Sequence, residues 1–273
     1  MPFLPIDRFD DPRIADYRNV PDPELLRRRG VFVAEGRLVV RTLLTSSRLQ
    51  ALSVLVTEAA RRSLADVLDP RAGDLPVFVA DRSLLAQVVG FNLHRGCLAL
   101  GARPALRAAT DVLASLPDRA LVVVLEGVGN ADNVGGVFRN AVAFGADAVL
   151  LGPGCCDPLY RKAIRVSIGG TLRMTYAKFS SWPDPLREVG KAGFTLAALT
   201  PAGDAEDLAR FSQRAESRGR LALLFGAEGA GLSPAAAAAA DHRIRIPMAA
   251  GVDSLNVATS CGIALHRLQR VAE

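Results

Sequence analysis

The sequence predicts an α/β fold in which helices cover both faces of a parallel sheet. Four short apolar runs in the second half of the chain are typical of buried strands, and stretches with helical periodicity separate them. Glycine-bearing turns follow several of these runs, at the edge where open α/β sheets bind ligands. The chain has 273 residues, 50% of them hydrophobic and 22% charged, so we expect a globular protein with one large domain or two ordinary ones.

The first hundred residues predict a small α/β domain. Apolar runs indicate two strands and amphipathic stretches indicate three helices: strands at Val54–Thr57 and Val77–Ala80, and helices at 37–45, 58–67 and 82–89. Strands that alternate with helices in this way are typical of a sheet with helices packed on it.

The stretch from Gly101 to Asp118 divides the chain. Pro104 and Pro117 lie on either side of a short Ala- and Leu-rich helix, a composition typical of a connection between domains. We therefore expect a first domain at 1–106 that includes an N-terminal extension, a linker at 107–118 and a second domain at 119–273.

The second domain is expected to contain four clear strands and one more near its end. The four are Leu121–Leu125, Ala148–Leu151, Thr195–Leu199 and Leu221–Phe225, and Ile244–Pro247 is expected to supply the fifth. Ser233 followed by Pro234 is a typical helix start, so the alanine run at 235–240 is interpreted as an ordinary helix.

The helix after the first of these strands opens with the segment Asn133–Arg139. Its apolar residues recur at helical spacing, and Gly145 stands where a left-handed C-terminal cap is needed. Arg139 lies off the apolar face and four residues after Gly135, so it projects over a position without a side chain. Free N–H groups of the first turn and this arginine suit a phosphate. An N-cap asparagine, a packing glycine and a solvated arginine explain the segment equally well, so both interpretations stay open.

Two further glycine-bearing turns follow strands of the same domain. Gly226–Leu232 comes directly after Phe225 and places three glycines around one carboxylate, Glu228, so that backbone can approach a ligand closely. The other turn spans 246–257, where Ser254 is expected to cap the last helix. Taken singly, Glu228 is equally explained as a solvated turn residue and Asn256 as a polar residue of a first helical turn. Three such turns in one domain indicate a ligand site.

Common nucleotide-binding and nucleophile motifs are excluded by spacing. No Gly-Lys-Ser or Gly-Lys-Thr ends a phosphate loop. The turn Glu126–Gly129 superficially suggests a dinucleotide site or an ordinary methyltransferase turn, but Asp132 replaces the third glycine and no acidic residue follows Leu151 to bind a ribose. No serine or cysteine forms a nucleophile elbow with a credible histidine partner.

Net charge favours a nucleic-acid partner and lies mainly in the first part of the chain. The total is +5, with a net of +4 over residues 1–110 and +1 over the remainder. Arginines dominate the basic residues of that first part: Arg27–Arg29, Arg37, Arg41, Arg48, Arg61 and Arg62. They would offer a polyanion several contacts, and a solvated basic surface is nearly as good an explanation.

Cysteine and histidine usage argues against disulfides and metal sites. The four cysteines are Cys97, Cys155, Cys156 and Cys261, and only Cys155 and Cys156 are neighbours in sequence. None of the three histidines, His94, His242 and His266, is paired with them at a metal-ligand spacing. No apolar run approaches the roughly 20 residues that a membrane span needs, and the N-terminus lacks a signal-peptide core. We expect a cytoplasmic protein with reduced thiols and no metal.

Read in order, the three turns strongly resemble the SpoU (TrmH) family of RNA ribose 2′-O-methyltransferases, in the SPOUT superfamily. Asn133, Gly135 and Arg139 match the first motif of the family, Leu223–Leu232 match the second, and Ile246–Met248 with Ser254–Val257 match the third. Four other segments look like the family: Cys155–Pro158, Arg165–Gly170, Phe32–Gly36 and His94–Gly96, the last two resembling the substrate-binding domain of longer members. The resemblance covers roughly residues 15–270.

The resemblance implies features that periodicity does not reveal. It implies a parallel-sheet methyltransferase domain with a deep C-terminal trefoil knot, preceded by a small α/β domain with a ribosomal-protein-like fold. S-adenosylmethionine would lie in the knot loops, with nine expected contacts: Leu199, Thr200, Gly226, Glu228, Gly229, Ile246, Met248, Ser254 and Leu255. The family works as a homodimer through the knotted domain, and its matching arginine crosses into the partner's site.

The implied reaction is methylation of a ribose 2′-hydroxyl, and alignment of the reactants supplies roughly 7–11 kcal/mol of such a barrier. We expect Arg139 to stabilise the adjacent RNA phosphate and the developing alkoxide, and Asn133 to orient the ribose. Glu228, Ser254 and Asn256 would form the remaining polar wall. Because arginine stays protonated, the proton would leave through a phosphate, a carboxylate or water. The expected substrate is ribosomal RNA; transfer RNA and a catalytically silent, ribosome-associated RNA-binding protein are the alternatives.

Overall fold

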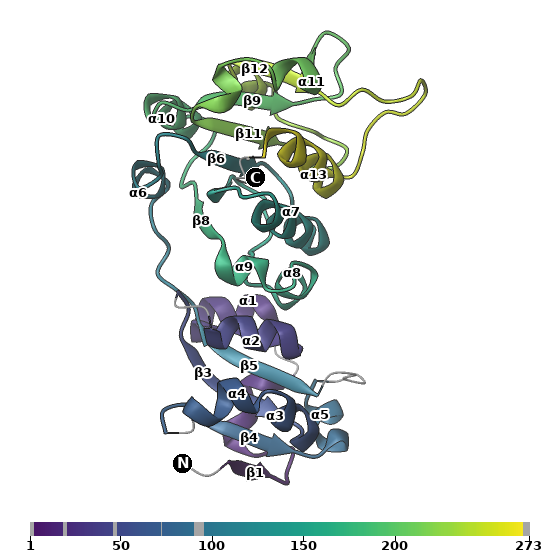
Figure 1. The fold of residues 1–273 in the computed structure, drawn as a ribbon. Helices are drawn as coiled ribbons and strands as arrows, with labels where there is room; N and C mark the ends of the chain where they lie inside the picture. The colour runs from purple at the N-terminus through teal and green to yellow at the C-terminus, as the bar shows by residue number, and fades with distance from the viewer. Residues whose placement is uncertain (1–2, 19–20, 46–47, 72, 90–95, 270–273) are drawn as a thin grey trace. The chain divides into compact units, whose positions relative to one another are not determined.

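A computed structural model describes residues 3–18, 21–45, 48–71, 73–89 and 96–269. These residues form two compact units (Figure 1). The first comprises Met1–Pro104 with Pro158–Arg173, and the second Ala105–Asp157 with Met174–Glu273. The domain boundaries drawn from the sequence stay a prediction, and His94 and Arg95 lie outside the described residues.

The first unit is built on a five-stranded mixed sheet of order β1-β4-β3-β5-β2. β1 and β3 run parallel to β4, whereas β5 is antiparallel to both β3 and β2. The strands are β1 (Leu4–Ile6), β2 (Val31–Glu35), β3 (Ala51–Val56), β4 (Val77–Ala80) and β5 (Cys97–Ala102). Its helices are α1 (Asp22–Glu24), α2 (Arg37–Thr45), α3 (Glu58–Ser63), α4 (Ala65–Leu68), α5 (Arg82–Val89), α8 (Arg161–Val166) and α9 (Gly170–Arg173), with shorter turns at Pro12–Tyr17, Leu25–Arg29 and Asp69–Arg71.

The structure confirms the strand predicted at 77–80 and the helices at 37–45 and 82–89 and corrects three other assignments. Thr57 is not a strand residue; its Oγ1 accepts the Ala60 N–H as the N-cap of α3. The helix expected over 58–67 is interrupted at Leu64, between α3 and α4. Gly101 is not the start of a connection, because it pairs with Phe32 inside the sheet as part of β5.

The second unit contains a seven-stranded, all-parallel sheet of order β10-β12-β9-β11-β6-β7-β8. Its strands are β6 (Leu121–Leu125), β7 (Ala148–Leu151), β8 (Thr175–Lys178), β9 (Thr195–Leu199), β10 (Glu206–Asp207), β11 (Leu221–Phe225) and β12 (His242–Arg245). The four strands predicted with clear boundaries are all confirmed. The fifth prediction was displaced: β12 ends at Arg245, and Pro247 has no N–H with which to continue a ladder.

Helices cover both faces of this sheet, as predicted (Figure 1). The helices of the second unit are α6 (Ala109–Ala114), α7 (Ala131–Ala143), α10 (Pro185–Lys191), α11 (Leu208–Phe211), α12 (Pro234–Ala238) and α13 (Val257–Leu268), with a short turn at Glu216–Arg218. Buried residues of α6, α10 and α12 share one apolar cluster with the sheet. Every residue of β6 is buried, which explains its continuous apolar sequence.

α7 and α13 lie side by side and approach each other closely (Figure 1). A Cβ atom on Gly136 would lie 2.7 Å from the Cβ of Ala258, so the crossing depends on that glycine. The Asn140 side chain donates to the Ala258 carbonyl at 2.7 Å, which joins the two helices by a hydrogen bond. The chain thus returns from β12, beyond β9, to pack against the helix that follows β6. Such a return is consistent with a C-terminal knot, and the knot stays a prediction.

Two helix starts differ from the sequence interpretation, whereas a third helix start and one helix end agree with it. α7 begins earlier than expected, with Asn130 as N-cap, so Asn133 lies inside the first turn. Asn256, not Ser254, caps α13, because its Oδ1 accepts the N–H groups of Ala258 and Thr259. The predicted Ser233 cap of α12 is confirmed, and Gly145 has a φ of 71°. No helix among the described residues is long and apolar enough to cross a membrane.

Candidate active site

Three segments that follow β9, β11 and β12 line one cavity of about 350 Å³ in the second unit. Because these strands are parallel, their carboxyl ends meet at the same edge of the sheet. The cavity lining includes all nine residues that the resemblance assigns to the cofactor: Leu199, Thr200, Gly226, Glu228, Gly229, Ile246, Met248, Ser254 and Leu255. A concave site with mostly apolar walls and a few polar groups is typical of a small-molecule site.

The loop after β11 depends on a glycine at its first position. A Cβ atom on Gly226 would lie 2.0 Å from the carbonyl carbon of Gly231 and 2.2 Å from the nitrogen of Leu232. The loop therefore closes on itself, backbone against backbone, and the Gly231 N–H donates to the Ala227 carbonyl at 2.9 Å. Gly229 and Gly231 have φ angles of 85° and 69°, which side chains rarely tolerate. This geometry presents Glu228 at the tip of the loop.

Asn256 connects the three turns that the sequence singled out. Its Nδ2 donates to the Asn133 Oδ1 at 2.8 Å and to the Glu228 Oε1 at 2.6 Å. Its Oδ1 is occupied by the first turn of α13, so both ends of the amide are used. The side chain thereby holds α7, the Gly226–Leu232 loop and α13 in one register. The structure brings together three of the five predicted catalytic residues.

Asn133 is the buried member of this group. Asn133 as a whole residue is 7% exposed, whereas Glu228 and Asn256 are exposed and Glu228 lines the cavity. A buried amide without partners would destabilise the fold, and the bond from Asn256 satisfies its oxygen. The amide nitrogen of Asn133 donates no hydrogen bond to the described residues, so it can donate to a bound substrate.

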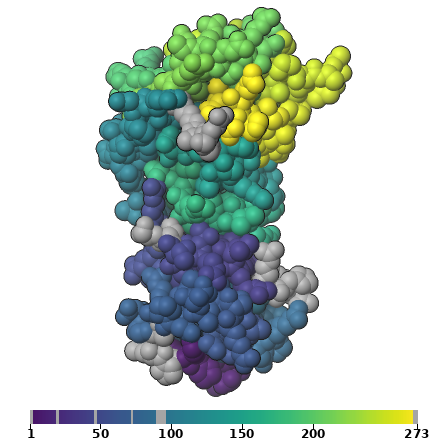
Figure 2. All heavy atoms as spheres, viewed as in Figure 1, coloured from purple at the N-terminus to yellow at the C-terminus, as the bar shows by residue number. Residues whose placement is uncertain are grey.

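Arg139 and Ser254 stand apart from the Asn256 network. Arg139 is exposed on α7, does not line the cavity and forms no hydrogen bond or ion pair with the described residues. Ser254 lines the cavity but has no direct bond to the other predicted catalytic residues that the structure describes. The segment between β12 and α13, which carries Ser254, projects from the surface of the second unit (Figure 2). An exposed guanidinium outside the cavity suits a large anionic substrate better than a cofactor contact.

The cavity also has lining residues that the sequence interpretation missed. Asp253 and Ser260 add polar groups, and Pro201, Phe225 and Val257 add apolar surface. Asp253 adjoins Ser254 in the third motif and could have been identified from that position. Ser260 lies one turn into α13, and only the close approach of that helix to the loops brings it to the cavity.

Burial determines the protonation state of the cysteine thiols. None of the four cysteines forms a disulfide with another described residue, and burial raises the pKa of Cys97 to about 12 and also raises the pKa of Cys155 and Cys261. These thiols therefore stay protonated and unreactive near neutral pH. Among the described residues, no group of three or more His, Cys, Asp or Glu side chains is placed to hold a metal ion.

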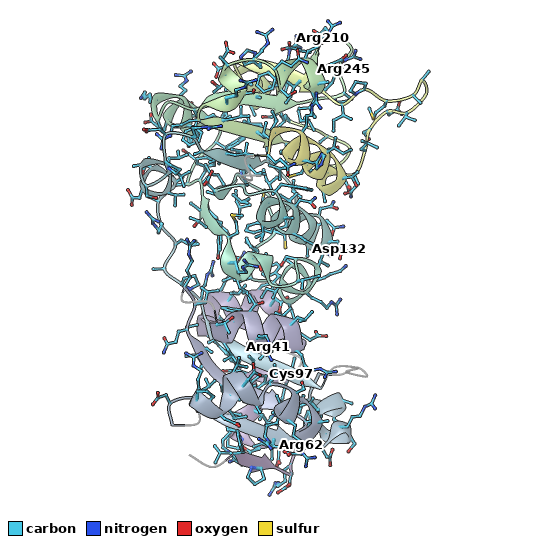
Figure 3. All side chains as sticks on the ribbon, in the orientation of Figure 1. Arg41, Arg62, Cys97, Asp132, Arg210 and Arg245 are labelled. Atoms are coloured by element: carbon cyan, nitrogen blue, oxygen red, sulfur yellow. The ribbon has the colours of Figure 1, made fainter. Side chains whose placement is uncertain are left out.

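Many arginines of the first unit are paired with carboxylates. Arg41 pairs with Asp66, and both Arg61 and Arg62 pair with Glu58 (Figure 3 labels Arg41 and Arg62). Arg29 pairs with Asp16. Arg27 and Arg28, by contrast, form no hydrogen bond or ion pair with the described residues. The positive charge available to a polyanion is therefore smaller than the arginine count of this unit suggests.

Known proteins resemble this chain over most of its length. Residues 120–266 match the model of the SpoU rRNA Methylase family. An uncharacterized tRNA/rRNA methyltransferase of Mycobacterium tuberculosis H37Rv is 42% identical over 96% of this chain and 90% of its own length. The 23S rRNA (guanosine-2′-O-)-methyltransferase RlmB of Vibrio cholerae is 28% identical over 88% of this chain and 87% of its own length.

A solved structure shares the fold over nearly the whole chain. The AdoMet-bound rRNA methyltransferase of Sinorhizobium meliloti superposes with a TM-score of 0.81 at 22% identity, over 97% of each chain. At that identity the likeness shows the fold alone. The α/β fold with a parallel methyltransferase sheet, predicted from the sequence, is confirmed.

Proposed function

Because the chain belongs to the SpoU rRNA Methylase family of RNA methyltransferases, we propose that it methylates a ribose 2′-hydroxyl of ribosomal RNA with S-adenosylmethionine as donor. The observation that carries the proposal is the Asn256 network, which joins the cavity wall at Glu228 to Asn133 on α7. One polar network thus borders both a small-molecule cavity and the helix that carries the free Arg139. A methyltransferase needs such adjoining places for donor and acceptor.

The residues of the cavity fit S-adenosylmethionine. Leu199, Ile246 and Leu255 offer apolar surface for an adenine ring, while the glycine backbone of the Gly226 loop permits close approach. Glu228 and Asp253 supply negative charge suited to the positively charged part of the molecule. Bound there, the cofactor would supply a methyl group activated by its sulfonium.

The chain's own side chains would position and stabilise the RNA. Asn133 would hold the ribose through its free amide donors, because its oxygen is already occupied by Asn256. Arg139 would bind the neighbouring phosphate and stabilise the alkoxide that develops as the hydroxyl loses its proton. That proton would pass to a carboxylate, a phosphate or water rather than to the arginine.

The first unit is proposed to bind the RNA substrate. Arg27 and Arg28 lie next to each other in sequence and are the candidates for phosphate contacts, because they have no acidic partner among the described residues. A relative whose name specifies 23S rRNA and guanosine 2′-O-methylation favours ribosomal RNA, and a relative named for both tRNA and rRNA keeps transfer RNA as the alternative. Such a reaction is expected in the cytoplasm.

We also infer that the protein works as a homodimer through the second unit. Arg139 is exposed and lies outside the cavity of its own chain, as expected for a side chain that completes a partner's site. Ile263, which is 39% exposed, adds an apolar residue to the outer face of α13. A twofold interface would place equivalent helices of the two copies against each other.

Substitution of Gly226 by alanine is expected to weaken S-adenosylmethionine binding. The new Cβ would collide with the backbone of Gly231 and Leu232, so the loop must open and its lining contacts separate. We expect the dissociation constant to rise at least about 10-fold in calorimetric titration, equivalent to about 1.4 kcal/mol. Gly203→Ala is the matched control, because nothing lies within 4 Å of a Cβ at that position. Unchanged affinity in Gly226→Ala would contradict the assignment of this cavity.

The proposed substrate is tested by transfer of labelled methyl to separate ribosomal and transfer RNA pools from cells that lack the enzyme. We expect label in large-subunit ribosomal RNA and none in the same RNA from cells that contain the enzyme, where the site is already modified. Label confined to transfer RNA would show that transfer RNA, and not ribosomal RNA, is the substrate. Cofactor binding without transfer to either pool would favour a silent RNA-binding protein.

A further inference from the structure

Glu126 joins three segments at the edge of the sheet that bears the cavity. It is the first residue after β6, and its backbone N–H donates to the Phe225 carbonyl at 2.9 Å, beside the step at which β11 becomes the Gly226–Leu232 loop. One carboxylate oxygen accepts the indole N–H of Trp182, and the other accepts the backbone N–H of Ser233 at 2.9 Å. Both oxygens of this partly buried carboxylate therefore have protein donors.

The bond to Ser233 holds the point at which the loop closes. Ser233 is the residue directly after the loop, and its own side chain caps α12 by accepting the Ala236 N–H. Gly226, at the start of the loop, already contacts the Gly231–Leu232 peptide. Glu126 thus restrains the beginning of the loop through β6–β11 pairing and its end through Ser233.

The bond to Trp182 is supported by close packing. The indole lies against Gly152, which follows β7, because a Cβ atom there would be 3.2 Å from the ring. The ring also lies 5.7 Å from that of Phe179, centroid to centroid. A packed indole with a charged acceptor has little rotational freedom, so Trp182 fixes the orientation of the carboxylate.

We propose that Glu126 is a positioning residue that clamps the Gly226–Leu232 loop in its cofactor-binding shape. It does not line the cavity, and it acts on the cavity through the loop. The loop carries Glu228, which is bonded to Asn256 and through it to Asn133, so the clamp also governs the register of the catalytic network. This inference rests on the proposed function for the identity of the cofactor.

Glu126→Gln tests the clamp, because it replaces one acceptor oxygen by an N–H₂ donor that must face Trp182 or Ser233. We expect the dissociation constant for S-adenosylmethionine, measured by calorimetry, to rise on the order of 10-fold. At saturating cofactor, kcat should fall less than about 3-fold, because the bound cofactor then holds the loop and its bond to Asn256 in place and Glu126 does not touch the reacting groups. Glu216→Gln is the matched control, since Glu216 is exposed and makes no hydrogen bond or ion pair with the described residues.

Two cofactor-free readouts decide the clamp separately from the proposed function. In Glu126→Gln the Ser233 amide should exchange with deuterium faster, and the emission of Trp182, the one tryptophan of the chain, should shift. Unchanged exchange and emission would overturn the clamp even if the wild-type protein binds the cofactor. Failure of the wild type to bind would overturn the proposed function and leave these two readouts decisive for the clamp.

Ser233→Ala separates the clamp from general loosening of the fold. This variant removes the cap of α12 but keeps the backbone N–H that Glu126 accepts. The free energy of unfolding should fall by about 1 kcal/mol, the usual contribution of a helix cap. The dissociation constant for the cofactor should stay within about 3-fold of wild type, because the bond from the Ser233 N–H to Glu126 is kept. A loss of cofactor affinity as large as that of Glu126→Gln would show that any destabilisation near the loop lowers the affinity. That result would overturn the specific role of the carboxylate.

Discussion

Arg139→Ala is expected to lower kcat/KM for RNA by about 10²–10³-fold or more, the usual effect of removing one donor to a developing oxyanion. The affinity for S-adenosylmethionine should stay within about 2-fold, because Arg139 does not line the cavity. Its side chain is exposed and has no partner to lose among the described residues, so thermal stability should also be unchanged. Single-turnover methyl transfer with calorimetric cofactor titration measures both quantities.

Arg187→Ala is the control for a general loss of positive charge, since Arg187 is exposed on α10 and forms no ion pair with the described residues. An equal loss of cofactor affinity in Arg139→Ala would contradict the assigned role.

Subunit mixing adds a sharper test of the dimer. At a cofactor concentration well below the dissociation constant of Gly226→Ala, both this variant and Arg139→Ala should have low activity. If the arginine serves the partner's site, mixing the two proteins should raise activity, because one site of each mixed dimer has both intact parts.

Asn256→Asp is expected to abolish methyl transfer almost completely while preserving the start of α13. The aspartate keeps an oxygen that can cap the Ala258 and Thr259 N–H groups. It loses both donated hydrogen bonds and places a second negative charge next to Glu228, whose oxygen lies 2.6 Å from the present amide nitrogen. We expect kcat/KM to fall about 10²-fold or more, because like charges at this distance separate the loop from the start of α13.

Asn256→Ser is the companion variant. Serine can also cap the helix but adds no charge, so it isolates the loss of the two bonds from the repulsion. Its activity should lie between wild type and Asn256→Asp, and thermal denaturation should show similar stability for the two variants. Equal activity in both would mean that repulsion contributes nothing. Full activity in Asn256→Ser would contradict a role for the network in catalysis.

The fold could be predicted from the sequence where apolar runs are buried on both sides. β6, β7, β9 and β11 have the predicted boundaries, because central parallel strands require continuous hydrophobic residues. β8 and β10 were missed because they lie toward the edges of the sheet and carry polar residues, such as Lys178 and Glu206. Short edge strands are identified by their partners rather than by their own composition.

The candidate site was predictable as three separate turns but not as one network. The glycines around Glu228 indicated close backbone approach, and the structure shows this at Gly226. The hydrogen bonds of Asn256 join residues more than 100 positions apart in one case and 28 in the other, and no local pattern indicates them. Ser254 was predicted as the cap of α13 because serine is a common N-cap, yet Asn256 occupies that position.

From the sequence, the glycine turn after β6 was excluded as a dinucleotide site and its glutamate was overlooked. In the sequence Glu126 has the properties of an ordinary turn residue, whereas in the structure Trp182 and Ser233 donate hydrogen bonds to it. Both partners are distant in sequence, so spacing could not reveal the bond. Long-range polar contacts of this kind are the part of a site that sequence periodicity does not contain.

The most direct test of the central claim is mass spectrometry of nucleosides from RNA methylated by the purified protein with labelled S-adenosylmethionine. A methyl group on the ribose is expected, which would appear as one labelled 2′-O-methylnucleoside, and the label should disappear with Arg139→Ala. A labelled base-methylated nucleoside with an unmodified ribose would contradict the account, because the roles proposed for Asn133 and Arg139 require a ribose hydroxyl as the acceptor.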